Sequence, residues 1–157
     1  MERTATLKSP VGRLAITANG RGLIGVRFGA RRAVQVSRSR DRAAAHLRRA
    51  VAELQEYFAR RRTTFSLPLD FSRGTVFQKK VWRACARIPF GETRSYAGLA
   101  EAVGSPRAAR AIGQAMGANP VAIIVPCHRV VRLDGSLGGF GAGLSVKEAL
   151  LRLEGAF

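Results

Sequence analysis

The chain has 157 residues and a mass of 16.9 kDa, which suits one ordinary domain or two small ones sharing an interface. Its 46% of hydrophobic residues can bury a sizeable core, which excludes wholesale disorder, and its two cysteines are too few for a disulfide framework. The 27 lysines and arginines against 10 acidic residues give a formal net charge of +17, which favours a polyanion such as nucleic acid as partner. This charge is spread along the chain and locates no binding face, and a solvated basic surface is the alternative interpretation.

The first part of the chain predicts an antiparallel sheet followed by a helix. Apolar and polar residues alternate in three stretches separated by turn signals, at 4–8, 14–18 and 24–28. Residues 29–40 are polar and basic and predict a loop. Apolar residues then recur every three or four positions over 41–60, which predicts an amphipathic helix, and alternation over 65–71 predicts a short strand.

The character of the sequence changes at Ser72-Arg73-Gly74, so we expect two domains, residues 1–72 and 73–157. Thr75 and Gln78 have the spacing of a capping box at the start of a helix that ends before Pro89. Two further short helices follow, the first capped by Ser95 and the second by Ser105, with a tight Gly-Ser-Pro turn between them. This arrangement is typical of a helix-turn-helix.

The last part of the chain combines an apolar segment, a turn, a glycine-rich stretch and a helix. Residues 121–125 predict a buried strand or packed segment, and Asp134-Gly135 predicts the tip of a hairpin, the wing of a winged helix. The glycines of 138–143 predict a loop where the backbone approaches another group closely. Ser145 and Glu148 have capping-box spacing at the start of the last amphipathic helix.

Cys127 is a candidate nucleophile because His128 and Arg129 follow it directly. The thiolate is the reactive form of cysteine, and a nearby histidine or arginine charge lowers the thiol pKa. For an isolated Cys-His pair, a small buried apolar residue is the alternative interpretation. Cys85 fits that alternative, since it lies on the apolar stripe of a helix, and we interpret it as structural.

Residues 76–155 strongly resemble the O6-alkylguanine-DNA alkyltransferases, also called methylated-DNA-protein-cysteine methyltransferases. The matching segments, in the same order and spacing, are VFQKKVW, IPFGETRSYAGLA, AARAIGQAMGANP, IVPCHRVV, GGFGAGL and KEALLRLEG, and PCHRV is highly specific to this family. The amino-terminal part resembles the family more weakly, through its strands and SPVGRL. The resemblance implies an α/β plus α fold: an amino-terminal ribonuclease H-like antiparallel sheet with a helix, then a winged helix-turn-helix domain that carries the active site.

By this resemblance, Cys127 attacks the alkyl carbon on the O6 atom of guanine in duplex DNA and keeps the alkyl group irreversibly. His128 would take the thiol proton through a water, and Glu148 would orient the imidazole, although Glu148 also stands where a capping box wants a glutamate. Tyr96 would protonate or hydrogen-bond the departing guanine, and Asn119 would hold the turn before the active-site segment.

The resemblance also implies how DNA is held. The target base must be flipped out of the duplex, and Arg110 would occupy the place that it leaves. Further expected DNA contacts are Ser95, Ala109 and Arg129. The expected lining of the base pocket is Met116, Val130, Phe140 and Gly141.

We expect no cofactor and no metal, because only His46 and Cys85 remain outside the PCHR segment as ligands for the zinc site of some relatives. The expected partner is double-stranded DNA containing O6-alkylguanine, bound by a cytoplasmic monomer with no membrane or obligate protein partner. Two other functions are considered. A non-catalytic binder of DNA lesions is disfavoured by the presence of Cys127, and a winged-helix transcription factor would have no need of PCHRV.

Overall fold

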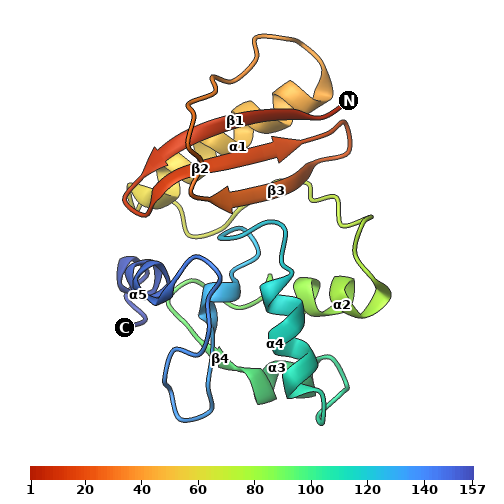
Figure 1. Cartoon of the computed structure of the whole chain (residues 1–157), viewed down its shortest axis with the longest axis vertical. Helices are drawn as coiled ribbons and strands as arrows, with labels where there is room; N and C mark the ends of the chain where they lie inside the picture. Colours follow the sequence, from red (N-terminus) through yellow and green to blue (C-terminus); the bar gives the residue numbers. More distant parts are fainter. The chain divides into compact units, whose positions relative to one another are not determined.

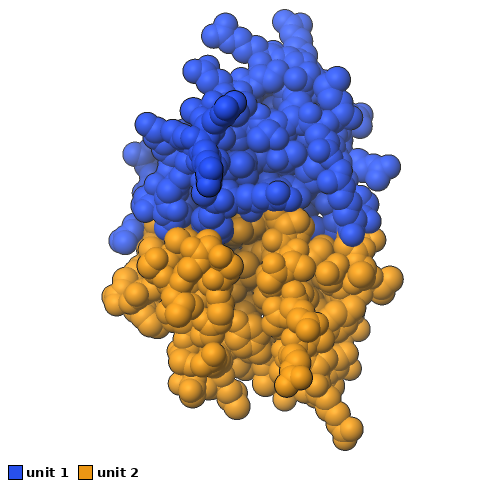
Figure 2. Space-filling model, viewed as in Figure 1, with its two compact units in different colours: residues 1–73 blue, residues 74–157 orange.

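The computed structural model describes the whole chain, residues 1–157 (Figure 1). The chain divides into two compact units, residues 1–73 and residues 74–157, which we call unit 1 and unit 2 (Figure 2). None of the helices combines the length and the apolar character that crossing a bilayer would require.

Unit 1 is a three-stranded antiparallel sheet packed against one helix. The strands β1 (Arg3–Ser9), β2 (Gly12–Ala18) and β3 (Leu23–Phe28) lie in the order β1-β2-β3. Alternate residues of the strands are buried, as the period of two requires of a sheet with one covered face. The helix α1 (Arg42–Phe58) contacts all three strands and covers that face.

The boundaries of α1 follow from its sequence. Asp41 is the N-cap, and its carboxylate accepts a hydrogen bond of 2.9 Å from the backbone N–H of Ala44. Leu47, Leu54 and Tyr57, all fully buried, repeat at helical spacing on the side that faces the sheet. The predicted sheet and amphipathic helix are therefore confirmed.

The short strand predicted over 65–71 is wrong. This segment makes one isolated bridge, between Leu23 and Leu69, and no ladder. The backbone N–H of Leu23 donates to the carbonyl of Pro68 at 2.9 Å, and that of Asp70 donates to the carbonyl of Leu23 at 2.8 Å. Because proline has no N–H of its own, Pro68 cannot extend the pairing into a regular ladder.

Unit 2 is mainly helical. Its helices are α2 (Val76–Cys85), α3 (Tyr96–Ala102), α4 (Ala109–Gly117) and α5 (Leu144–Leu153). Both bonds of the capping box predicted at Thr75 and Gln78 are present. Trp82 of α2 is buried, and its indole N–H donates to the carbonyl of Ala115 in α4 at 2.8 Å, which fixes the two helices together.

The helix-turn-helix is formed by α3 and α4, which pack against each other. Ser95 caps α3, as predicted, with its hydroxyl accepting from the N–H of Gly98 at 2.9 Å. The prediction that Ser105 caps the second helix is wrong, since α4 begins at Ala109 and has no side-chain cap. Residues 105–108 instead close a separate turn, in which the N–H of Ala108 donates to the carbonyl of Ser105 at 2.9 Å.

The predicted wing is a turn rather than a hairpin. The short strand β5 (Val130–Val131) pairs in parallel with β4 (Arg94–Ser95), not with the chain that follows it. The N–H of Arg132 donates to the carbonyl of Ser136 at 2.9 Å and closes the turn. Beyond it, Gly138 has a φ of 72°, a left-handed conformation that does not continue a strand.

Candidate active site

Cys127 lies in a buried turn that the backbone holds. Residues 121–131 are all buried, and Cys127–Arg129 form a 3₁₀ turn directly after the apolar segment. The N–H of Cys127 donates to the carbonyl of Val125 at 2.8 Å, and that of Arg129 to the carbonyl of Pro126 at 2.9 Å. Cys127 is only 9% exposed, so the residue is nearly enclosed by the protein.

Asn119 fixes the chain just before this turn. Its side-chain NH₂ donates to the carbonyl of Val125 at 2.9 Å, and its side-chain oxygen accepts from the N–H of Val121 at 3.0 Å. The two bonds join both ends of the 121–125 segment to Asn119, two residues beyond the end of α4. These two hydrogen bonds are of the kind that the role predicted for Asn119, holding the turn before the active-site segment, would require.

His128 is fully buried and is paired with a glutamate that the sequence analysis did not name. Its Nε2 lies 2.7 Å from the Oε2 atom of Glu154. A carboxylate only accepts hydrogen bonds, so we assign the donated proton to Nε2. In the neutral ring Nδ1 is then an acceptor, and this buried atom has no protein hydrogen-bond partner. Nδ1 is therefore free to receive a proton through a water.

Arg129 and Glu154 form a buried ion pair beside the imidazole. The guanidinium donates through Nε to Oε1 of Glu154 at 2.7 Å and through Nη2 to Oε2 at 2.9 Å. Its Nη1 donates to the carbonyl of Ile88 at 2.6 Å. Arg129 is 5% exposed, so the prediction that it contacts DNA is wrong. Its charge is used inside the protein, where it balances Glu154.

The electrostatics of this cluster keep His128 neutral. Burial lowers the pKa of His128, and the hydrogen bond and negative charge of Glu154 oppose that shift. Because Arg129 already balances the carboxylate, burial prevails and the imidazole carries no charge at rest. A neutral imidazole with an unpaired Nδ1 is a competent general base.

The prediction that Glu148 orients His128 is wrong. Glu148 lies on the outer side of α5, where its carboxylate accepts from Nη2 of Arg152 at 2.8 Å. The two glutamates are six residues apart, and six steps of about 100° place them on different sides of a helix. Glu154 follows the last residue of α5 as its C-cap and is buried.

The capping box predicted at Ser145 and Glu148 is also absent. The helix α5 already begins at Leu144, after Gly143, and has no side-chain cap. Ser145 is therefore its second residue and stands too late in the chain to be the N-cap. The surface pair of Glu148 with Arg152 is the only contact found for the Glu148 carboxylate.

Lys147 is a buried cation that the sequence analysis missed. Its ammonium donates to three backbone carbonyls, those of Val130 at 2.7 Å, Leu137 at 2.5 Å and Gly139 at 3.2 Å. Burial lowers its pKa to about 8. Lys147 therefore ties the loop after β5 to the turn that carries Cys127, and its positive charge lowers the pKa of the thiol.

The Cys127 thiol is protonated at rest. Burial raises its pKa, while the Asn119 side chain and the charge of Lys147 act in the opposite direction without cancelling the shift. Cys127 therefore needs a base to become a nucleophile, and His128 is adjacent in the chain. Cys85 is fully buried, and burial raises its pKa strongly, which makes it unreactive.

Tyr96 lies against the glycine-rich loop. It is the first residue of α3 and is half-buried, and burial raises its pKa, so the phenol keeps its proton. A Cβ atom at Gly138 would lie 2.9 Å from the Tyr96 hydroxyl oxygen and 3.0 Å from its ring. The ammonium of Lys147 is 5.9 Å from the centroid of the Tyr96 ring and 6.0 Å from that of Phe140. The loop, the phenol and the lysine are thus neighbours.

We expect a Gly138→Ala variant to displace Tyr96, because the new Cβ would overlap the phenol and would force an alanine into a left-handed conformation. If Tyr96 has the role that the family resemblance implies, single-turnover alkyl transfer should slow by about tenfold or more, because a small misplacement of a group at the reacting atoms can cause such a loss. Gly139→Ala is the matched control, since a Cβ there meets nothing within 4 Å. Equal transfer rates for the two variants would show that transfer does not depend on the position of the Tyr96 phenol.

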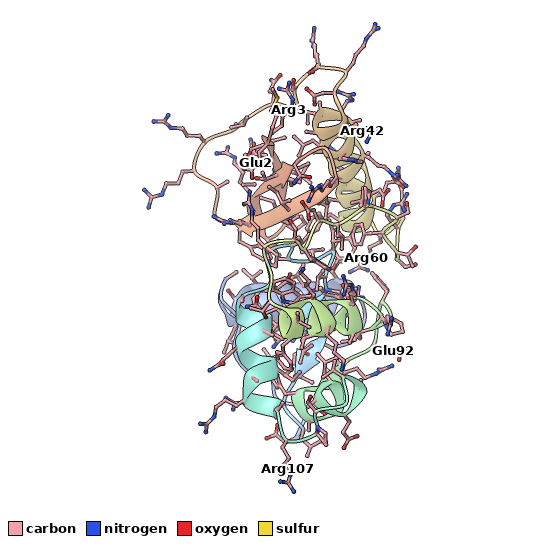
Figure 3. All side chains as sticks on the ribbon, turned by 90° about the vertical axis from the view of Figure 1, so that its right-hand side faces the viewer. Glu2, Arg3, Arg42, Arg60, Glu92 and Arg107 are labelled. Carbon is pink, nitrogen blue, oxygen red and sulfur yellow. The ribbon has the colours of Figure 1, made fainter.

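The remaining predicted site residues occupy β4, β5, α4 and the glycine-rich loop, with Ser95 in β4 and Val130 in β5. Arg110 is exposed on α4, and Ala109 is the first residue of that helix. Met116, near the end of α4, is buried. Phe140 is half-buried and Gly141 is exposed. Arg107, which precedes α4, projects into solvent (Figure 3).

Family models match both units of the chain. Residues 76–156 match the model described as "6-O-methylguanine DNA methyltransferase, DNA binding domain". Residues 3–71 match the one described as "6-O-methylguanine DNA methyltransferase, ribonuclease-like domain". The two matches together span both compact units.

Two similar proteins, one from a bacterium and one from an archaeon, share one name. A methylated-DNA–protein-cysteine methyltransferase of Mycobacterium tuberculosis is 46% identical over 152 residues, covering 95% of this chain and 90% of the relative. One of Methanosarcina acetivorans is 42% identical over 153 residues, covering 97% of each. A crystal structure of a Mycobacterium tuberculosis OGT in complex with DNA has a TM-score of 0.83 at 45% identity, covering 96% of this chain and 91% of that one.

Proposed function

The chain belongs to the 6-O-methylguanine DNA methyltransferase family, whose members are named methylated-DNA–protein-cysteine methyltransferases, and we propose that Cys127 is its alkyl acceptor. The protein repairs DNA by direct transfer of an alkyl group from the O6 atom of guanine to itself. One observation carries the assignment of Cys127: the neutral, buried His128 beside it, held through Nε2 by Glu154, has an unpartnered Nδ1.

The proposed reaction is a single displacement. A water relays the thiol proton of Cys127 to Nδ1 of His128, and Glu154 stabilises the imidazolium that forms. The thiolate attacks the alkyl carbon, the S–C bond forms and the C–O6 bond breaks, with its electron pair passing to the guanine. The phenol of Tyr96 donates a hydrogen bond or its proton to the departing base. The product is a thioether, which no group in the site can reverse, so each molecule reacts once.

The guanine is proposed to reach Cys127 by leaving the duplex. Flipping costs a few kcal/mol of stacking and pairing, which contacts to DNA must supply. We assign to Arg110, exposed on α4, the task of filling the vacated position in the stack. The neighbours proposed to contact DNA with it are Ser95 and Ala109. The groups proposed to line the base pocket are Met116, Val130, Phe140 and Gly141.

A non-catalytic lesion binder is the second candidate function. It would need the same DNA surface but neither a nucleophile nor a base. A neutral, buried His128, which directly follows Cys127 in the chain and is held through Nε2 by Glu154, favours transfer instead. The proposal further includes a monomer in the cytoplasm, without cofactor or obligate protein partner. Its proposed domains are residues 1–72 and 73–157, with a boundary one residue before that between units 1 and 2.

An Arg110→Ala variant should slow repair of duplex DNA by about tenfold or more, while transfer from free O6-benzylguanine stays near the native rate. The difference arises because the free base needs no flipping. Arg107→Ala is the matched control. Arg107 is exposed just before the same helix, and its replacement removes the same charge. Equal slowing on duplex and free base would mean that Arg110 supports the fold or the chemistry rather than flipping.

The direct test of the proposed function is a titration. A duplex with one O6-methylguanine is supplied in large excess, and repaired guanine is counted. We expect repair to stop at one guanine per protein molecule. Continued turnover would contradict the irreversible thioether, and tight binding without repair would identify a lesion binder.

A further inference from the structure

The basic loop predicted over 29–40 is an ordered arc in unit 1. The N–H of Thr6 in β1 donates to the carbonyl of Val34 at 2.8 Å, and the N–H of Val34 donates to the Thr6 hydroxyl at 2.8 Å. Arg13 donates to the carbonyl of Arg31 at 2.8 Å. Arg48 donates to the carbonyls of residues 37 and 39 at 3.0 and 2.9 Å. Two arginine side chains are thus used to hold the backbone of this loop in place.

The same loop presents arginines that have no acidic partner. We call the arginine arc the five exposed residues Arg31, Arg32, Arg38, Arg40 and Arg42. None of them forms an ion pair, and nitrogen-tipped side chains project outward from this loop while Arg42 lies at the start of α1 (Figure 3). Their positive charges are therefore uncompensated within unit 1.

The acidic residues of unit 1 are all engaged elsewhere. Their partners are Arg73 for Glu2, Arg3 for Asp41, Arg49 and Arg62 for Glu53, Arg62 for Glu56, and Asn19 for Asp70. Even Asp41, which lies between Arg40 and Arg42 in the chain, is paired with Arg3, whose Nε and Nη2 atoms donate three hydrogen bonds to its carboxylate. Arg42 moreover occupies the first position of α1, where the helix dipole disfavours a positive charge. The arc is thus not built to stabilise the fold.

The chemistry of the arc fits the phosphates of a nucleic acid. Guanidinium groups bind phosphate oxygens through paired hydrogen bonds, and an ordered backbone reduces the entropy lost when they do. A segment that binds a membrane surface carries large apolar side chains opposite its basic ones, whereas residues 29–42 contain no aromatic residue and no leucine. We propose that the arginine arc is a second DNA-binding surface, which contacts the phosphate backbone without reading sequence.

This inference rests on the proposed function only in that DNA is the substrate. The arc adds affinity for duplex DNA, whether or not the duplex contains a lesion, and takes no part in the displacement at Cys127. Its contribution must therefore appear in DNA binding and its salt dependence, and must be absent from transfer with a free base.

The test is a variant of the full chain with Arg31, Arg32, Arg38 and Arg40 each replaced by glutamine. Its affinity for an unmodified duplex is measured by fluorescence anisotropy over a series of salt concentrations. Each lost phosphate contact should reduce the slope of log K against log salt by about 0.9, so two or more contacts give a reduction of about 2 or more. Affinity at low salt should fall by about tenfold or more, while transfer from O6-benzylguanine keeps its native rate.

A control variant loses the same charge from exposed positions of unit 1 outside the arc, through Lys8→Gln, Arg21→Gln, Arg60→Gln and Arg61→Gln. We expect it to bind DNA with nearly native affinity and slope. Equal losses of DNA affinity in both variants would show a general effect of net charge and would contradict the proposed role of the arginine arc. An arc variant whose salt dependence has the native slope would contradict it as well. An arc variant that loses only its binding to anionic vesicles would identify a membrane surface instead. Failure of the native protein to repair a duplex that carries O6-methylguanine would contradict the proposed function, not the arc.

Discussion

A Cys127→Ala variant is expected to transfer no alkyl group from either methylated duplex or O6-benzylguanine. The only other thiol, Cys85, is fully buried with a strongly raised pKa, so it cannot replace the missing nucleophile. The variant should fold, with a free energy of unfolding within about 1–2 kcal/mol of the native value, because only a small side chain is removed. It should also bind the alkylated duplex, since the proposed DNA contacts are intact.

The measurement compares single-turnover transfer, DNA binding and urea denaturation for three proteins. Cys85→Ala is the matched control, because it removes a buried cysteine from the same unit. We expect this variant to transfer the alkyl group at the native rate. A Cys127→Ala variant with normal repair would show that another residue is the acceptor. Loss of transfer in Cys85→Ala, with the fold intact, would assign that role to Cys85.

A Glu154→Gln variant is expected to lose both stability and reactivity. The neutral amide leaves the charge of Arg129 buried without a counterion, which should lower the free energy of unfolding by roughly 3–5 kcal/mol. It also removes the charge that stabilises the His128 imidazolium during thiol deprotonation, so transfer should slow by about 10²-fold or more.

The dependence of transfer on pH separates chemistry from stability in this variant. The negative charge of Glu154 raises the pKa of His128, so its loss lowers that pKa. The acid limb of the rate profile should therefore shift to lower pH while the plateau falls. Transfer is measured with O6-benzylguanine at temperatures where the variant is folded. If the plateau rate and the acid limb of the pH profile both kept their native values, Glu154 would be only a structural partner of Arg129.

Glu148→Gln is the matched control on the same helix. Its carboxylate is partly exposed and pairs only with Arg152, so stability should change by less than about 1 kcal/mol and transfer should keep its native rate and pH profile. A slowed rate or a shifted profile for this variant would restore Glu148 to the site.

The position of Glu154 illustrates what local pattern can and cannot predict. The family resemblance assigned the orienting role to Glu148, and capping-box spacing offered the same residue a second role, but spacing alone does not say where the chain enters the helix. Thr75 stands directly before α2 and forms its box, whereas Ser145 lies one residue inside α5. The informative signal was the helical stripe of Lys147, Leu150 and Glu154, on which two charged residues share the buried face. Charges on such a stripe indicate internal partners.

Arg129 and Lys147 were misjudged or missed for a related reason. Both are charged residues whose partners, Glu154 for the first and the carbonyl of Val130 for the second, are 25 and 17 residues away in the chain. Local pattern contains no information on such distant contacts. The nucleophile and its base were accessible because Cys127 and His128 are adjacent in a specific motif.

Secondary structure was predictable where one segment determines it. The strands β1–β3, the helix α1 and the cap at Ser95 follow from alternation, helical periodicity and capping chemistry. The strand expected at 65–71 depends on pairing with a distant segment, and the hairpin expected at Asp134 is displaced by pairing with a distant segment. Pro68 interrupts the first, and β4 takes the place of the second partner through parallel pairing with β5.

The central claim, irreversible transfer to Cys127, is tested most directly by weighing the protein after one reaction. The native chain is incubated with excess duplex carrying one O6-methylguanine, and its intact mass is recorded before the chain is digested and its peptides are mapped. We predict a mass increase of one methyl group per molecule, located on Cys127, with Cys85 unmodified. An unchanged mass alongside repaired DNA, or a methyl group on any other residue, would contradict the account.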